Sequence, residues 1–583
     1  MHKRTIGRVI AAFVAACLFF SCAPALAQMD PTIRVYLRRL EIADTVRIEF
    51  RGDYMLEGGA MAFSGGTQVD ISLRGSRLVL HAPGLAVSLG SSLKLIRCSG
   101  ETPGGLTLNG SGVYEGDLAL DIADGAIRPV LTIDIEDYLL GVVPYEMGDS
   151  FPLEALKAQA IAARTYALRK RGSSGAYDVE DTTNDQAFRG RNTYSPLSEQ
   201  AVYETAGLVG MYRGELAQCY YSASNGGQTE LGQHVWPTDE PQAYGYMDMR
   251  DDPYDLANDA SLVRRYTVHK TPGSSGVGPA LHSALVAALR DPLVRLGYAA
   301  EDDLVRIDEV SAIRAQTPRF DGDSRLMTEL AFTVKVSLRE ATFRDTPPTD
   351  GAADAVADPQ PDASPTPSPT PRPTATPAYS PYTALDQDFT VMLPIFGAGG
   401  CEQAMGLSIS TTPNELITVT DIGSAFMIEA RRYGHGVGMS QRGAEQMARA
   451  HGMTVDQILA FYYPGMQVAP VVYDRAPLPT PDMELMATPA PTASPTPRPT
   501  LMPVTETGLP EGAYIAVVTN IDEDSSLNLR VEPSLSADVL RRLYKDQKLV
   551  VLQSSADGWS HVRTDVIEGY VRTEYLQTAE DGE

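Results

Sequence analysis

A chain of 583 residues, 43% of them hydrophobic, holds enough apolar material for several folded domains despite its 41 prolines. The formal net charge of -26 argues against a nucleic-acid partner, because binding to a phosphate backbone depends on clustered lysine and arginine.

The first 27 residues have the parts of a secretion signal. Three basic residues within the first eight precede an apolar run at residues 9–20, and Ala-Leu-Ala at 25–27 fits a small-x-small cleavage site. We therefore expect a signal peptide over residues 1–27 and a secreted, extracytoplasmic mature chain. A lipoprotein signal that would leave Cys22 as the lipid anchor is the weaker alternative. We expect no later stretch to span a bilayer.

Short apolar runs broken by glycines follow the signal. They lie at residues 33–37, 45–50 and 78–80, and their alternation is typical of strands. The sequence therefore predicts a β-rich N-terminal region over residues 28–112.

A strong helix is predicted at residues 153–171, after an extended run at 131–143. Ser150 is a plausible N-cap, and Gly172 stands just past the end. Arg164 falls inside the apolar arc of this helix. A buried guanidinium must meet a carboxylate, a carbonyl cluster or a polar ligand, so both a structural pairing and a role near a site remain open.

Glu146 is the candidate catalytic residue. Its neighbours Pro144, Tyr145 and Met147 should partly desolvate the carboxyl group, which would raise its pKa and let it act as a general acid near neutral pH. The alternative is a solvated carboxylate beside a helix N-terminus, where the helix dipole favours negative charge.

A second candidate site segment follows a predicted strand at residues 215–222. It combines hydroxyl groups with a glycine pair, so it exposes backbone N–H groups and side-chain oxygens that can bind a sugar or an anion. The candidates are Tyr221, Ser222, Ser224, Asn225 and Gly226. The alternative is that these residues only form a turn.

Alternate glycines surround His435 in residues 433–444, which then enter a helix that ends near Gly452. The spacing fits neither a dinucleotide nor a P-loop fingerprint, so we expect close backbone packing beside a ligand or strand. His435 is interpreted, in order of preference, as a residue that orients its neighbours, an ordinary hydrogen-bonded histidine, or a metal ligand.

Two tracts rich in proline, threonine and serine, at residues 346–381 and 477–503, have too few bulky apolar residues to fold. We read the first as an excursion within one domain. The second lies within a linker over residues 471–510. Residues 511–583 then carry short strands spaced as in a small all-β barrel.

Cysteine spacing argues against a metal site. After signal cleavage three cysteines remain, at positions 98, 219 and 401, and they lack the paired short spacing of zinc ligands. We predict no metal and no cofactor, and at most one disulfide.

Several of these stretches, in the same order, resemble the stage II sporulation protein D and amidase enhancer family. The resemblance covers roughly residues 113–470 and rests on Glu146-Met147 and on residues 151–167, 221–227, 433–444 and 458–465. Residues 527–533 and Gly558-Trp559 resemble a bacterial SH3 domain, which implies attachment to the cell wall. The expected fold class is therefore α+β: a β-rich N-terminal region (28–112), a mixed α/β domain (113–470) and a C-terminal SH3-like barrel (511–583).

The family resemblance implies that the substrate is peptidoglycan and that the activity is that of a lytic transglycosylase, with Glu146 as acid and base. One carboxyl group is enough for this reaction, because the 6-hydroxyl of muramic acid is the nucleophile. Arg164 and the loop from Ser222 would position the glycan strand, and His435, Ser440 and Gln441 would complete the pocket.

Two other functions remain open. The chain could be a non-catalytic wall-binding protein that stimulates a cell-wall amidase, its partner in that case, or a wall-anchored scaffold. The sequence also departs from the family. Gly148 stands where the family often has proline, residues 430–432 replace a glycine-bearing approach to Tyr433, and the proline-rich excursion interrupts the domain.

Overall fold

The computed structural model describes residues 28–98, 104–342, 378–475, 478 and 512–578, apart from short gaps at 173–174, 193, 274–275, 411, 522–525, 536, 538, 556 and 565–567. The chain divides into two compact units, Met1–Ala487 and Thr488–Glu583. The expected signal peptide and most of the two proline-rich tracts lie outside the described residues. No helix within the described ranges combines the length and hydropathy needed to cross a membrane.

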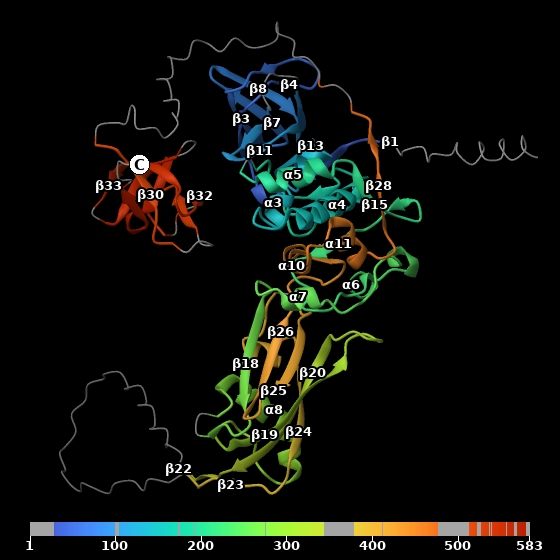
Figure 1. Ribbon diagram of the computed structural model, residues 1–583, viewed down its shortest axis with the longest axis vertical. Helices are drawn as coiled ribbons and strands as arrows, with labels where there is room; N and C mark the ends of the chain where they lie inside the picture. Colours follow the sequence, from blue (N-terminus) through green and yellow to red (C-terminus); the bar gives the residue numbers. More distant parts are fainter. Residues whose placement is uncertain are drawn as a thin grey trace, which may run out of the picture. The chain divides into compact units, whose positions relative to one another are not determined.

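Two β-sheets form the N-terminal part of the first unit (Figure 1). The seven-stranded sheet has the order β14 (Val179–Glu180), β2 (Thr32–Tyr36), β13 (Ala126–Asp134), β12 (Gly116–Ala123), β9 (Ser92–Arg97), β4 (Tyr54–Leu56) and β5 (Ala62–Phe63). The six-stranded sheet has the order β11 (Ser111–Tyr114), β10 (Leu106–Leu108), β3 (Thr45–Phe50), β6 (Gln68–Arg74), β7 (Arg77–Ala82) and β8 (Leu85–Gly90). The predicted β-rich N-terminal region is confirmed. The expected boundary at residue 112 falls inside it, because β12 pairs with both β9 and β13.

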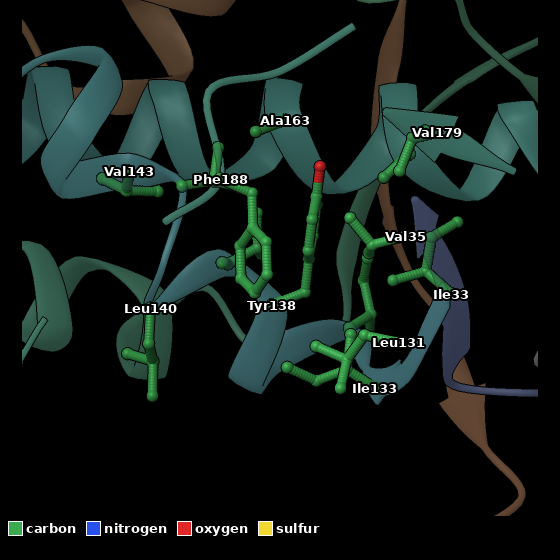
Figure 2. Packing of buried hydrophobic residues seen from close by; sticks show 14 of the residues in the cluster. Ile33, Val35, Leu131, Ile133, Tyr138, Leu140, Val143, Ala163, Val179 and Phe188 are labelled. Carbon is green, nitrogen blue, oxygen red and sulfur yellow. The ribbon is translucent and has the colours of Figure 1, made fainter. Parts of the chain in front are cut away.

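Six helices of the first unit share one hydrophobic core with these sheets. They are α2 (Ile135–Leu139), α3 (Val143–Glu146), α4 (Leu153–Lys170), α5 (Pro196–Glu204), α10 (Gln441–His451) and α11 (Val455–Tyr462). Figure 2 shows Tyr138 beside Phe188 between α4 and the sheet, and the two ring centroids are 4.9 Å apart. Six of the thirteen buried residues of α4 are alanines, whose small side chains allow neighbouring elements to approach closely.

Two local predictions around these helices were wrong. Residues 131–143 do not stay extended, because Asp134 accepts a hydrogen bond from the backbone N–H of Glu136 and starts α2. Ser150 does not cap α4, whose N-cap is Pro152 without a side-chain cap. The predicted helix itself is confirmed, and Gly172 past its end has a φ of +71°.

A second lobe with its own hydrophobic core lies between α7 (Pro253–Ala257) and β27 (Met439–Ser440). Its elements are β18 (Val263–His269), α8 (Pro279–Arg295), β19 (Val305–Pro318), β20 (Met327–Leu338), β21 (Ala341–Thr342), β22 (Ala378–Tyr379), β23 (Thr383–Ala384), β24 (Phe389–Pro394), α9 (Cys401–Ala404), β25 (Leu416–Asp421) and β26 (Ala425–Arg431). The first and last of the long strands, β18 and β26, pair from Val263↔Arg431 onward. Strands β21 and β22 pair across the proline-rich residues 343–377.

The second unit is an antiparallel sheet around a separate small core. Its strand order is β32 (Val539–Leu543), β31 (Leu527–Arg530), β35 (Glu568–Arg572), β34 (Trp559–Arg563), β33 (Lys548–Ser554), β30 (Tyr514–Val518) and β36 (Leu576–Thr578). This confirms the predicted small all-β C-terminal domain and, with the first unit, the α+β class.

Candidate active site

A short parallel ladder joins two of the sequence segments singled out above. β17 (Tyr221–Ser222) pairs with β27 in the register Tyr221↔Met439 and Ser222↔Ser440. Gly438, just before β27, has a φ of +71°, and a Cβ atom there would lie 2.1 Å from the carbonyl oxygen of Tyr220. The glycine is therefore needed for this close approach of the two strands.

Replacing Gly438 with alanine should lower the free energy of unfolding by about 2–4 kcal/mol, since strain from the positive φ adds to a backbone clash. Gly452 is the matched control, because its φ is +60° and a Cβ atom there meets nothing within 4 Å. Gly452→Ala should cost only about 1 kcal/mol. Denaturant unfolding of both variants measures the difference, and equal losses would contradict the proposed contact.

Glu146, the last residue of α3, is partly exposed, and its carboxyl group is held by uncharged groups. Oε1 accepts a hydrogen bond of 2.7 Å from the backbone N–H of Ala187, and Oε2 lies 3.4 Å from Nε2 of Gln441. Burial raises the pKa of Glu146, and hydrogen bonds from Ala187, Gln441 and the Tyr221 hydroxyl offset only part of the increase. Burial therefore favours the protonated form of this carboxyl group more than solvent would.

Two glutamines that the sequence analysis missed support these contacts. Gln186 donates to the Tyr221 hydroxyl at 2.9 Å and accepts from the Tyr138 hydroxyl at 3.1 Å. Gln159 of α4 lies 3.4 Å from the amide of Gln441 through its Oε1. The sequence does contain a sign of this contact. Gln159 is an amide among the alanines of α4, and a buried amide needs hydrogen-bond partners.

Arg164, predicted to position substrate, does not reach this site. Its guanidinium is fully buried and forms a 2.6 Å ion pair with Glu136 of α2. It also donates to the carbonyl oxygen of Leu208 at 3.1 Å. The sequence left two roles open for Arg164, and the structure shows the ion pair with Glu136. A buried cation requires such a nearby anion.

Ser224, Asn225 and Ser440 were also predicted to bind substrate, but in the structure their side chains bind buried aspartates and do not contact Glu146. All three are buried, and they bind two aspartates at the start of α7. Ser224 Oγ and Ser440 Oγ donate to Asp255 at 2.8 and 2.5 Å, and Asn225 Nδ2 donates to Asp252 at 2.7 Å. These side chains hold β17 and β27 to α7.

Gly226 likewise belongs to the turn: its N–H donates to Ser224 Oγ at 3.2 Å, and its φ is +70°. Ser222 faces Gly434, where a Cβ atom would lie 2.6 Å from the Ser222 Cβ atom. The Ser222 hydroxyl is buried and has no hydrogen-bond partner among the described residues. Among the described residues, neither Gly226 nor Ser222 is bonded to Glu146.

His435 lies beside β17 in an aromatic cluster. Its ring is 4.9 Å from Trp236 and 6.0 Å from Tyr220, centroid to centroid. Nδ1 accepts from the N–H of Val437 at 3.0 Å, so the proton of the neutral ring is on Nε2. Burial, with the charge of Arg432, lowers the pKa of His435 to about 4, so the ring is neutral near pH 7.

The three cysteines of the described residues are buried free thiols. Burial raises the pKa of Cys219 to about 12, so this thiol is not a ready nucleophile or metal ligand. Within the described residues, no group of three or more His, Cys, Asp or Glu side chains is placed to hold a metal ion.

Of the residues predicted from sequence, the structure thus brings together Glu146, Tyr221 and Gln441. They come from α3, β17 and the start of α10, three segments far apart in the chain. The arrangement offers one protonatable carboxyl group with neutral hydrogen-bond partners.

Parts of this chain are similar to known proteins. Residues 123–212 match the stage II sporulation protein family, and residues 525–577 match the bacterial SH3 domain. The chain is 38% identical over 148 residues to an uncharacterized protein of Brachyspira hyodysenteriae. It is 30% identical over 328 residues to the amidase enhancer of Bacillus subtilis, and 30% over 133 residues to stage II sporulation protein D of the same organism.

These three alignments cover 25%, 56% and 20% of this chain. They cover 40%, 39% and 39% of the relatives, so the chain spans about two fifths of the length of each. The family match includes α3 with Glu146 and all of α4. The chain therefore contains a domain of the stage II sporulation protein family and a C-terminal bacterial SH3 domain.

Proposed function

We propose that this protein acts on peptidoglycan as a lytic transglycosylase that cleaves the glycan bond between N-acetylmuramic acid and N-acetylglucosamine. The observation that supports this is Glu146, whose burial raises its pKa and whose hydrogen-bond donors are all uncharged. A general acid needs its proton near neutral pH, and a cation bonded directly to the carboxyl group would lower its pKa.

In the proposed reaction, Glu146 first donates its proton to the glycosidic oxygen as the bond to C1 breaks. The carboxylate then accepts the proton of the muramic acid 6-hydroxyl, and the 6-oxygen bonds to C1 to form a 1,6-anhydro end. A retaining hydrolase would need a second carboxylate about 5–5.5 Å away as nucleophile. The groups that contact Glu146 in the described chain are a backbone amide, a side-chain amide and a phenol.

The proposed substrate lies outside the cytoplasm, so we also propose that the mature chain is secreted and stays at the cell wall. The secretion pattern of residues 1–27 and the bacterial SH3 domain support this. Peptidoglycan glycan strands are the proposed partner.

The second candidate is a non-catalytic protein that stimulates a cell-wall amidase. The observation that favours it is the 328-residue alignment with the Bacillus subtilis amidase enhancer, which covers 56% of this chain. In that case the carboxyl group of Glu146 would be dispensable, and the amidase would be the partner.

Incubation of the purified full chain with peptide-free glycan strands separates the two functions. Mass spectrometry should find 1,6-anhydro-muramic ends if the chain is a transglycosylase. An enhancer would release nothing from these strands alone and would instead raise the rate at which an added amidase frees peptides from intact wall. The absence of anhydro ends on both substrates would refute the enzymatic proposal.

Replacing Tyr221 with phenylalanine should move the alkaline limb of the pH–rate profile to higher pH by about 0.5 to 1. The Tyr221 hydroxyl stabilises the Glu146 carboxylate and so lowers its pKa; without it the pKa rises, and the acid keeps its proton to higher pH. Tyr54→Phe removes a hydroxyl bonded to Gly116 in the N-terminal sheet and should leave the profile unchanged. An alkaline limb that does not shift, or that shifts to lower pH, would contradict the hydrogen bond between Tyr221 and Glu146.

A further inference from the structure

Two exposed side chains near Glu146, the ring of Tyr145 and the guanidinium of Arg189, have no role in the proposed reaction. Tyr145 precedes Glu146 in α3 and is 37% exposed. The guanidinium of Arg189 lies 5.4 Å from the centroid of the Tyr145 ring. Arg189 is exposed as well, and the same loop supplies the Ala187 N–H that binds Glu146 at 2.7 Å. The cation thus stands two residues from the group that holds the candidate acid.

The backbone that carries Arg189 is held in place. Its N–H donates to the carbonyl oxygen of Gly141 at 3.2 Å. Phe188, the preceding residue, is buried, and a Cβ atom on Gly141 would lie 2.5 Å from its ring. Only the side chain of Arg189 is therefore free to adjust to a ligand.

A second guanidinium, that of Arg39, lies in the 3-10 helix η1 (Arg38–Leu40) and lacks a full set of partners. Its Nε is buried without a hydrogen bond among the described atoms, and so is Oδ2 of Asp181, 3.9 Å away. Burial raises the pKa of Asp181 to about 6, so this carboxyl group takes up a proton at a higher pH than a solvated aspartate does.

The charge of Arg39 also acts on the exposed ring. Burial raises the pKa of the Tyr145 phenol, and the positive charges of Arg189 and then Arg39 offset part of that increase. Nη2 of Arg39 lies 3.4 Å from the hydroxyl of Tyr114. Two cations therefore act on one ring, in a chain whose net charge of -26 would otherwise repel an anionic polymer.

We propose that Tyr145, Arg189 and Arg39 form a subsite for a sugar that carries a carboxylate, next to the bond that Glu146 acts on. The ring offers a flat apolar face to the sugar, and the guanidinium groups bind the carboxylate. This inference rests on the proposed function for its choice of glycan. In peptidoglycan the carboxylate has two sources, the lactyl group of peptide-free muramic acid and the stem peptide.

Binding is measured with the full chain carrying Glu146→Gln, so that no ligand is turned over. Three labelled oligosaccharides of equal length serve as probes: peptide-free muramyl glycan, the same glycan with stem peptides, and a chitin oligosaccharide without carboxylates. Adding Arg189→Gln should raise the Kd for a carboxylate-bearing probe about tenfold, the value of one charge-assisted hydrogen bond. The Kd for the chitin probe should change less than twofold. Arg39→Gln should act in the same direction, and Arg189→Lys should retain part of the preference.

Arg264 on β18 is the matched control, because it is an exposed arginine whose replacement by glutamine removes the same charge. Arg264→Gln should change none of the three Kd values. A loss confined to the peptide-free glycan assigns the lactyl carboxylate, and a loss confined to the peptide-bearing glycan assigns the stem peptide.

The subsite is overturned if Arg189→Gln weakens all three probes equally or none of them, or if the parent variant does not prefer carboxylate-bearing glycans over chitin. Melting temperatures establish that each variant is folded. Because the readout is binding, it is separate from the test of catalysis. If the wild-type chain forms no anhydro ends, the transglycosylase proposal is refuted. The measured preference for carboxylate-bearing glycans still shows whether the subsite exists.

Discussion

Glu146→Gln should lower the rate of anhydro-end formation by about 10²–10⁴-fold, the usual contribution of general acid and base catalysis. Glutamine has the shape of glutamate, and its carbonyl oxygen can still accept the hydrogen bond from Ala187, so the site should keep its geometry. It has no proton to donate to the leaving oxygen and cannot accept one from the 6-hydroxyl. Product analysis by mass spectrometry gives the rate.

Glu154→Gln is the control for this experiment. Glu154 is a carboxylate in the first turn of α4, paired with Lys157 at 2.8 Å and bonded to the N–H of Val455. Its replacement should leave the rate within about twofold of wild type, since it is not among the contacts of Glu146. If Glu146→Gln retained a third or more of the wild-type rate, the carboxyl group would not be the acid, and the enhancer function would be favoured.

Arg164→Met should lower the free energy of unfolding of the first unit by about 3–5 kcal/mol, because it leaves the Glu136 carboxylate buried without its cation. The N–H of Gly207 and the hydroxyl of Tyr473 still bind Glu136, at 3.0 and 3.1 Å, but neither carries a charge. Urea unfolding in a Trp559→Phe background follows the first unit alone, because Trp236 is then the remaining tryptophan of the chain.

A double variant tests the pairing itself. Adding Glu136→Gln removes the uncompensated anion, so the two substitutions together should cost less than the sum of their separate effects. A loss below about 1 kcal/mol for Arg164→Met, or simple additivity in the double variant, would contradict a strong buried ion pair.

Sequence patterns that lie within a single helix or domain predicted those parts of the fold correctly. Helix α4 followed from its apolar periodicity and from Gly172, and the C-terminal sheet from its evenly spaced strands. The error at residues 131–143 has a local cause. A single side-chain bond from Asp134 turns an apolar run into α2, and an apolar run alone does not separate strand from helix.

The candidate site was harder to predict, because its polar residues look alike in sequence whether they face a ligand or a buried partner. Ser224 and Asn225 have the composition of a sugar-binding loop, yet their partners are Asp255 and Asp252, about thirty positions away. Nothing in the local pattern marks that pairing. Glu146 could be chosen as a candidate because its neighbours in sequence are apolar, and in the structure burial raises the pKa of its carboxyl group.

The second lobe enters and leaves through β18 and β26, which pair side by side at Val263 and Arg431. An insertion whose two ends emerge at one spot changes nothing in the chain path before or after it. The lobe is also bonded to the segment after β17, since the Arg325 N–H donates to Gln228 and Gln228 donates to the carbonyl oxygen of Asp323. Changes of length in the lobe away from these contacts can therefore leave α7, β17 and β27 in place. Relatives that share the Glu146 region can accordingly differ widely in what they carry between these two strands.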